Sequence, residues 1–321
     1  MPREQKLLTA LRRSNPLPVD RVGPEIKDRT APGGTMHGVG LPLVTPFEKN
    51  GDVDYERLRD LVGWIEDRGV DFLVPCGSNS EAELMTAGER RRVVETVVDE
   101  ASVPVLAGTG TPGLRETRQA TAGAAEAGAD AALVVTPFYY NHDQATLAAY
   151  YRELADAASI PVYLYFVPVY TDVRLEPDTV GELAEHGNIV GMKDSSGDID
   201  AFVRTKNRVG EEFSLMVGSG GVVAQALSAG ASGAVLALAN VAPEGASAIF
   251  AAHEVGEHRR ARERNADLLE LNHAVTAEYG IPGLKWAMRE RGAPAGHPRS
   301  PHREPDADAQ EHLAALVDDL G

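Results

Sequence analysis

Lys193 is the residue of this sequence whose position best suits covalent chemistry. It ends the apolar run 188–193 (NIVGMK) and is followed at once by the polar stretch DSSGD. A neutral lysine amine attacks carbonyl carbons, and a desolvating pocket lowers a lysine pKa toward that neutral form. A lysine at the end of a strand is more often a solvated surface residue, so position alone does not decide its role. Ordinary roles account for the other lysines, which lie in the N-terminal extension, a turn, a polar stretch and a predicted helix: Lys6, Lys27, Lys49, Lys206 and Lys285.

Tyr165 is a second reactive group in a comparable position. It lies near the end of the apolar run 161–166 (PVYLYF), the run that precedes that of Lys193. A phenol there could transfer protons as a general acid and base. The alternative is a core tyrosine whose hydroxyl reaches the surface. Tyr163 shares the strand face of Tyr165, and we expect it to pack deeper.

The segment PCGSNSE places small residues after another apolar run. Gly77, Ser78, Asn79 and Ser80 offer hydroxyls and free backbone N–H groups, which suit the binding of a carboxylate. Gly, Ser and Asn are also ordinary turn formers, so this signal is weak by itself.

Apolar runs of strand length alternate along the chain with longer helical patterns. The runs are continuously apolar, as in parallel strands buried on both faces. There are eight, at 38–44, 71–76, 103–108, 131–137, 161–166, 188–193, 213–218 and 232–238. This alternation predicts an α/β fold, a (β/α)8 TIM barrel, whose active site lies at the C-terminal strand ends. A doubly wound open sheet is the alternative, but LPLVTPF is not a glycine-rich phosphate turn.

We expect three parts in the chain. Residues 1–35, rich in Arg and Pro, form a flexible extension; residues 36–240 form the barrel; and residues 241–321 form its last helix and a helical C-terminal appendage. In the last part, helical patterns lie near 243–255, 259–279, 282–291 and 306–319. Met36 directly precedes the first strand and is an alternative initiator.

Charge and composition exclude several classes of partner. The formal net charge is −17, from 48 acidic and 31 basic residues, which argues against nucleic acid and anionic membranes. Abundant carboxylates with scarce lysine suggest an acidic, halophilic-type protein. No apolar run reaches the roughly 18 residues of a membrane span, and the start lacks the apolar region of a signal peptide. The single cysteine, Cys76, excludes an intramolecular disulfide and favours a reducing cytoplasm.

Histidine spacing predicts no metal site. The 9 histidines are scattered and form no HExxH pair. His253 and His258 are five residues apart, off the helical i, i+4 spacing, and we expect them on a helix surface.

Six short motifs together resemble one known family. They are LVTPF at 43–47, GSNSE at 77–81, AGTG at 107–110, TPFYYN at 136–141, LYFVP at 164–168 and GMKDSSGD at 191–198. The chain resembles the dihydrodipicolinate synthase and N-acetylneuraminate lyase family, which also includes 2-keto-3-deoxygluconate aldolases. The likeness extends from Gly38 to about Leu316.

The resemblance implies specific roles. Lys193 would form a Schiff base with a 2-oxo acid such as pyruvate, without a separate cofactor or metal, and Tyr165 would transfer protons. Ser78 would relay protons, and Tyr139 would reach across a tight dimer contact to complete the relay. The substrate carboxylate would lie on the segment Gly77, Ser78 and Asn79. Backbone groups of Gly218 and Val235 would lie near the intermediate. The resemblance also implies a homotetramer, a dimer of dimers.

Departures from the family pattern bear on the substrate. Tyr170 stands where dihydrodipicolinate synthases carry an arginine that grips the carboxylate of aspartate semialdehyde. Asn79, Ser80 and Phe166 replace a threonine, a glycine and an asparagine. A serine in place of that glycine requires either a negative φ or backbone strain.

The expected function is the reversible aldol cleavage of a 2-keto-3-deoxy sugar acid to pyruvate and an aldehyde. The nearest alternative is 4-hydroxy-tetrahydrodipicolinate (dihydrodipicolinate) synthase. Keto-deoxy sugar acid dehydratases and N-acetylneuraminate lyases share the same lysine chemistry. A non-catalytic paralogue that binds a metabolite is an alternative of another class.

Overall fold

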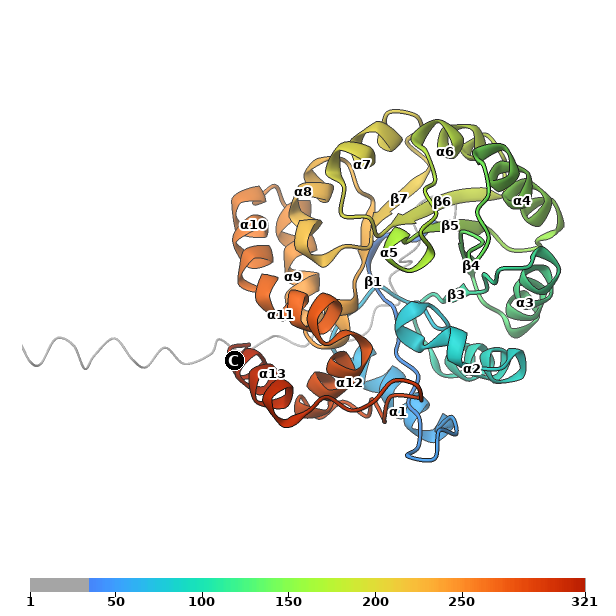
Figure 1. Cartoon of the computed structure of the whole chain (residues 1–321). Coiled ribbons are helices and arrows are strands. Elements are labelled where there is room, and N and C mark those ends of the chain that lie inside the picture. Colours follow the sequence, from blue (N-terminus) through green and yellow to red (C-terminus); the bar gives the residue numbers. More distant parts are fainter. Residues whose placement is uncertain (1–34, 321) are drawn as a thin grey trace, which may run out of the picture.

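Eight parallel strands form a barrel in this computed structural model, which describes residues 35–320 (Figure 1). The strands are β1 (Gly38–Leu41), β2 (Phe72–Leu73), β3 (Leu106–Gly108), β4 (Ala131–Val135), β5 (Val162–Phe166), β6 (Ile189–Asp194), β7 (Ser214–Val217) and β8 (Gly233–Val235). Their hydrogen-bonded order is β2-β1-β8-β7-β6-β5-β4-β3. An isolated parallel bridge between Leu73 and Val105 joins the two ends of this sheet. The predicted TIM barrel is therefore confirmed. The predicted N-terminal extension lies outside the described residues, except for residue 35.

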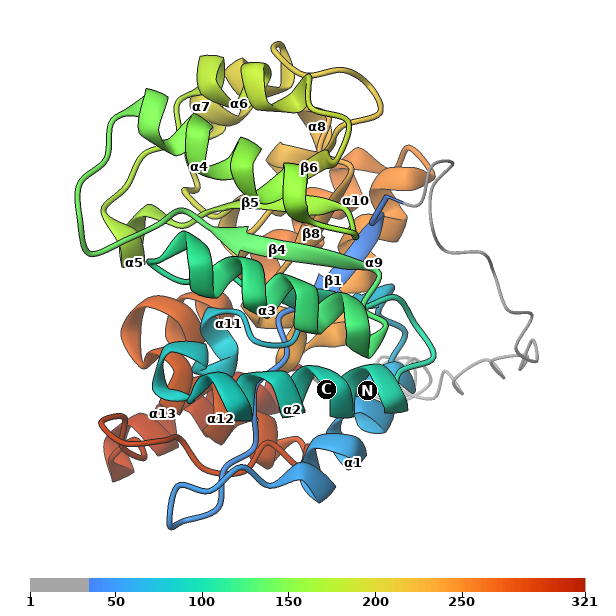
Figure 2. The same ribbon diagram turned by 90° about the vertical axis from the view of Figure 1, so that its right-hand side faces the viewer.

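Helices surround the strands (Figure 2). They are α1 (Tyr55–Glu66), α2 (Ala87–Glu100), α3 (Leu114–Ala127), α4 (Gln144–Ala157), α6 (Pro177–Ala184), α7 (Ile199–Lys206), α8 (Val223–Ser228) and α9 (Pro243–Glu254), with a short α5 (Pro168–Thr171) after β5. Side chains cap several of these helices. Thr86 and Glu89 form a reciprocal capping box on α2, and Asp143 caps α4. None of the helices in the described range is long and apolar enough to cross a membrane.

The C-terminal region is helical, as predicted, but it is more divided. It comprises α10 (His258–Asp267), α11 (Leu269–His273), a π-helical turn (Ala274–Glu278), α12 (Gly280–Glu290) and α13 (Ala307–Asp318). The helical pattern expected near 259–279 is present, but it is divided into three segments. The break falls at Leu268, which is buried with its Cδ1 against the position of Gly245 in α9.

Side chains inside the barrel form a core separate from the larger one between strands and helices. The inner core contains Met36, Phe72, Val74, Leu106, Ala131, Leu133, Tyr163, Tyr165, Val167, Met216 and Val235. At its floor, the Met36 N–H donates to the Tyr163 hydroxyl over 2.7 Å, and the Ser214 hydroxyl donates to the Met36 carbonyl over 2.9 Å. A Cβ at Gly191 would lie 2.3 Å from the Tyr163 ring, so only glycine leaves room for that ring.

Candidate active site

Lys193 and Tyr165 are direct register partners on the neighbouring strands β6 and β5. Both lie near the C-terminal ends of their strands, where barrel enzymes carry their active sites. Lys193 is only 5% exposed, and its Nζ lies 4.4 Å from the centre of the Tyr165 ring. The strands thus bring together the amine and the phenol that the sequence singled out.

Ser78 extends this pair across the barrel mouth. Its hydroxyl lies 3.3 Å from the Tyr165 hydroxyl, and either oxygen can be the donor. Ser78 begins a 3-10 turn, Ser78–Ser80, that follows the β2 segment. A proton can therefore pass between these two hydroxyls without a large movement.

The turn after β2 accommodates the unusual Ser80 without a left-handed backbone. The positive φ angles of this segment occur at Cys76, with 57°, and Glu81, with 55°, and Ser80 has none. The buried Ser80 hydroxyl donates to the Leu43 carbonyl. The serine in place of a glycine is therefore compatible with this backbone, and the Ser80 side chain links the turn to the segment that follows β1.

Gly218 lies beside the lysine, and Val235 lies in the inner core of the barrel. A Cβ at Gly218 would lie 2.8 Å from Lys193 Cε and 1.9 Å from the Ser195 hydroxyl oxygen, so glycine is required for the lysine to take this position. The Gly218 N–H donates to the Asp194 carbonyl over 2.6 Å. Val235 is fully buried in the inner core.

A cavity of about 250 Å³ opens at the barrel mouth. Its walls include Gly77, Ser78, Tyr165 and Tyr170, and Asn79 is partly exposed beside them without lining it. Burial raises the pKa of the Tyr170 hydroxyl, as does the nearby Tyr165, although the residue as a whole is 60% exposed. Lys193 does not line the cavity directly, but its amine lies against the Tyr165 ring, which does.

Tyr139 lies apart from the other predicted site residues. It is 85% exposed, has a φ of 80°, and packs edge-on against Tyr140 with ring centres 5.0 Å apart. Its neighbour Phe138 lines the cavity, whereas Tyr139 does not. Within a single chain, the structure therefore brings together Lys193, Tyr165 and Ser78 but not Tyr139.

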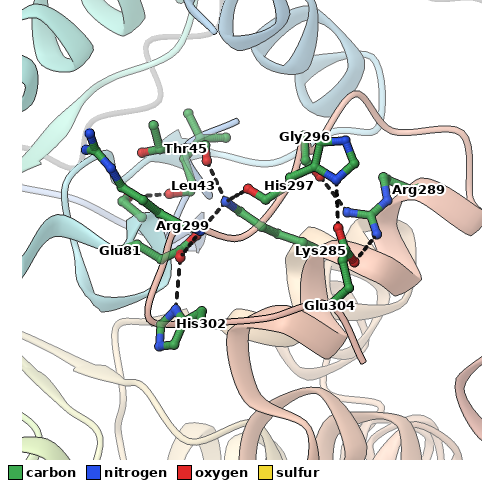
Figure 3. A network of polar contacts seen from close by, with 11 residues as sticks. Leu43, Thr45, Glu81, Lys285, Arg289, Gly296, His297, Arg299, His302 and Glu304 are labelled. Carbon is green, nitrogen blue, oxygen red and sulfur yellow. Dashed lines mark hydrogen bonds and ion pairs between the residues drawn. The ribbon is translucent and has the colours of Figure 1, made fainter. Parts of the chain in front are cut away.

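A buried ion pair beside the mouth escaped the sequence analysis. Lys285 of α12 is fully buried, and its Nζ lies 2.5 Å from Glu81 Oε1 (Figure 3). It also donates to the Thr45 and His297 carbonyls over 2.7 and 2.8 Å. Burial lowers the pKa of Lys285 to about 8, against the opposing effect of the Glu81 carboxylate. Lys285 occupies an ordinary helical sequence, so no local signal distinguishes it.

Glu81 also contacts the C-terminal segment of the chain. Its Oε2 accepts from the Arg299 backbone N–H over 2.8 Å and lies 2.9 Å from His302 Nδ1. Glu81 and His302 both line the cavity, together with Ile281. Within residues 35–320, no three His, Cys, Asp or Glu side chains are grouped so that they could hold a metal ion.

The chain matches proteins of one family along nearly all of its described length. The model of the dihydrodipicolinate synthetase family matches residues 35–320. An uncharacterized DapA-like lyase of Halobacterium salinarum is 38% identical over 288 residues, which cover 89% of this chain and 94% of the relative. A 4-hydroxy-tetrahydrodipicolinate synthase of Haloarcula marismortui is 37% identical over 284 residues, covering 88% and 93% of the two chains.

Solved structures agree with this match. A dihydrodipicolinate synthase from Acinetobacter baumannii, complexed with pyruvate, superimposes with a TM-score of 0.86 at 31% identity, covering 89% of this chain and 99% of that one. Enzymes of this family form a Schiff base between a lysine and pyruvate and use no metal cofactor. The match over residues 35–320, the barrel and the relatives together show that this chain belongs to the dihydrodipicolinate synthetase family of pyruvate-dependent lyases.

Proposed function

We propose that the protein catalyses the reversible aldol cleavage of a 2-keto-3-deoxy sugar acid to pyruvate and an aldehyde, with Lys193 as the Schiff-base residue. The observation that carries this proposal is the arrangement of one buried amine against a phenol that also reaches a serine hydroxyl. Lys193 Nζ lies 4.4 Å from the Tyr165 ring, and the Tyr165 and Ser78 hydroxyls lie 3.3 Å apart.

In this reaction Lys193 condenses with the C2 carbonyl of the acid and releases water. The resulting iminium accepts the electron pair of the C3–C4 bond when that bond breaks. Tyr165 takes the proton of the C4 hydroxyl as it passes its own proton toward the Ser78 hydroxyl, and the aldehyde leaves. The remaining enamine regains a proton at C3, and hydrolysis then frees pyruvate and Lys193. The Gly77 and Ser78 segment, beside Asn79, would hold the carboxylate that both pyruvate and the longer acid share.

The charge of the cavity supports a neutral aldehyde. Among the lining residues of the described chain there is no lysine or arginine, whereas Glu81 and Glu83 both line the cavity. Burial raises the pKa of Glu83, which reflects the cost of charge in this site. A second carboxylate on the aldehyde would therefore lack a cation to pair with. Tyr170, in the arginine's place, offers a hydroxyl instead.

The second candidate is 4-hydroxy-tetrahydrodipicolinate synthase, which condenses pyruvate with aspartate semialdehyde. Its support comes from the relative of that name in Haloarcula marismortui. The two reactions share the Lys193 chemistry and differ in the second substrate. A panel of aldehydes with pyruvate separates them.

We further propose that two copies of the chain meet at Tyr139 and that pairs of such dimers form a tetramer. Tyr139 and its neighbour Tyr140 are 85% and 67% exposed. Exposed aromatic side chains of this kind are typical of interfaces. In such a dimer Tyr139 would extend the proton relay of the partner's Tyr165 and Ser78.

The single buried thiol and the acidic composition also support a cytoplasm of high salt content as the setting.

Borohydride reduction in the presence of pyruvate tests the proposed function. We expect a reduced pyruvyl adduct on the peptide that contains Lys193, and none in the Lys193→Ala variant. Lys206→Ala is a matched control on the following helix and should keep the adduct. A wild-type protein that forms no adduct would overturn the proposal and leave the non-catalytic paralogue.

A further inference from the structure

A C-terminal segment, residues 296–304, is fastened to the barrel mouth by many polar contacts (Figure 3). The His297 N–H donates to the Phe47 carbonyl over 2.9 Å, and the His297 carbonyl accepts from Lys285. The Arg299 guanidinium makes two bonds, of 3.0 and 2.7 Å, to the Glu89 carboxylate. Arg289 contacts both ends of the segment, since it donates to the Gly296 carbonyl and to the Glu304 carboxylate. The segment is thus held in one position on the barrel.

Glu81 fixes the orientation of one side chain of this segment, His302. The fully buried Glu81 carboxylate forms an ion pair with the Lys285 amine. It also accepts hydrogen bonds from the Arg299 N–H and from His302 Nδ1. A carboxylate accepts hydrogen bonds, so His302 Nδ1 must carry a hydrogen. In the neutral imidazole, Nε2 is then an unprotonated acceptor. Glu81 therefore selects the tautomer of His302 as well as the orientation of its ring.

The rest of the His302 ring is available to the cavity. Its side chain is 35% exposed and lines the cavity that Tyr165, Ser78 and Tyr170 also line. Nδ1 is occupied by Glu81, which leaves Nε2 as the polar atom that can meet a ligand. The catalytic steps proposed above involve neither Nε2 nor any other atom of this ring.

We propose that His302 is a specificity-determining residue that accepts a hydrogen bond from a hydroxyl on the aldehyde-derived part of the substrate. This inference rests on the proposed aldol reaction and specifies its substrate class as hydroxylated aldehydes. The hydroxyls concerned are those at C5 or C6 of the keto-deoxy acid, since the C4 hydroxyl belongs to Tyr165. Glu81 is the positioning residue that orients the ring and holds the hydrogen on Nδ1.

The test compares two aldehydes that differ only in hydroxyl groups, glyceraldehyde and propanal, each with pyruvate. The quantity measured is the ratio of their kcat/KM values. We expect His302→Leu to lower this ratio about tenfold, the effect of one lost hydrogen bond in a cavity. Reaction with propanal should fall by less than reaction with glyceraldehyde, and borohydride trapping of pyruvate on Lys193 should persist. His302→Gln, which keeps a polar side chain, should lose less of the ratio.

Arg303→Gln is the matched control, since Arg303 is the next residue and is exposed. It should leave the ratio unchanged. If His302→Leu does not fold, His302→Ala is measured in its place, because alanine also lacks a hydrogen-bond acceptor. An unchanged ratio in that variant, or an equal loss with both aldehydes, overturns the inference while the pyruvyl adduct upholds the proposed function. Absence of the adduct from the wild type instead overturns the proposed function itself.

Discussion

Lys193 and Tyr165 are paired across two adjacent parallel strands, and the lysine Nζ lies 4.4 Å from the centre of the tyrosine ring. The pairing of the two strands therefore sets the separation of these residues. Their side chains supply the amine and the phenol that the proposed reaction requires. The hydroxyl of Tyr165 is not needed to hold this geometry, because the ring itself makes the contact. Removal of the hydroxyl alone is thus a clean test of proton transfer.

Tyr165→Phe should lower kcat by about 10²–10⁴-fold, the usual contribution of general acid–base catalysis. Trapping of pyruvate on Lys193 by borohydride should persist, since the amine is retained. Steady-state kinetics and mass spectrometry measure the two effects. Tyr163→Phe is the matched control on the same strand: its hydroxyl accepts from the Met36 N–H, so the loss should appear in stability. Equal turnover in Tyr165→Phe and wild type would rule out the assigned role.

Gly218→Ala should abolish most Schiff-base formation. The added Cβ would lie 2.8 Å from Lys193 Cε, which forces the lysine or its neighbour Ser195 to move. The yield of the reduced pyruvyl adduct measures this effect. Gly210→Ala, in the turn before β7, is the control because its Cβ would meet nothing within 4 Å. If Gly218→Ala and Gly210→Ala gave similar adduct yields, Lys193 would not need the space that Gly218 leaves for it.

Lys285→Met should destabilise the fold by about 3–5 kcal/mol, because it leaves the Glu81 carboxylate buried without its cation. Chemical denaturation measures the free energy of unfolding. The double variant Lys285→Met with Glu81→Leu should recover much of the loss, since it removes both charges. Full additivity of the two single variants would contradict the direct pairing of these residues.

The pair of Glu89 and Arg299 should contribute stability that disappears in acid. The hydrogen bond from Arg299 lowers the pKa of Glu89 from 4.5 to about 2. The contribution is therefore complete above 4.5 and is lost as the pH falls toward 2. The difference in unfolding free energy between wild type and Glu89→Gln should shrink through this window. A difference that stays constant across it would show that the charge of Glu89 does not contribute.

Salt should stabilise this protein. Its net charge of −17 produces self-repulsion that counterions screen. We expect the thermal unfolding midpoint to rise from dilute buffer to KCl concentrations on the order of 1 M, where the screening length is only about 3 Å. Full folding in dilute buffer with loss of stability in concentrated salt would refute the halophilic interpretation.

The sequence was sufficient for the barrel because each strand is a continuous apolar run. It overestimated the lengths of β2 and β3, which the structure limits to Phe72–Leu73 and Leu106–Gly108. A run of apolar residues indicates burial, whereas a strand is defined by regular hydrogen bonds to its neighbours. Within the described residues, β2 and β3 are joined only by the isolated bridge between Leu73 and Val105. Lys193 and Tyr165 were found because each follows or ends such a run.

The contacts of Glu81 with Lys285 and His302 could not be found in this way. Glu81 and His302 lie 221 positions apart, and their pairing depends on where the C-terminal segment settles on the barrel. No periodicity or local motif encodes such a contact. The histidine appeared as one of 9 scattered residues, and the lysine as part of an ordinary helix.

Ile281 and His302 form part of the cavity wall, although they come from the last portion of the chain. During synthesis on the ribosome, the strands that carry Tyr165 and Lys193 emerge long before these two residues. A nascent chain can therefore bring Lys193 and Tyr165 together early, but the cavity that we propose as the substrate site is complete only when the C-terminal segment has left the exit tunnel.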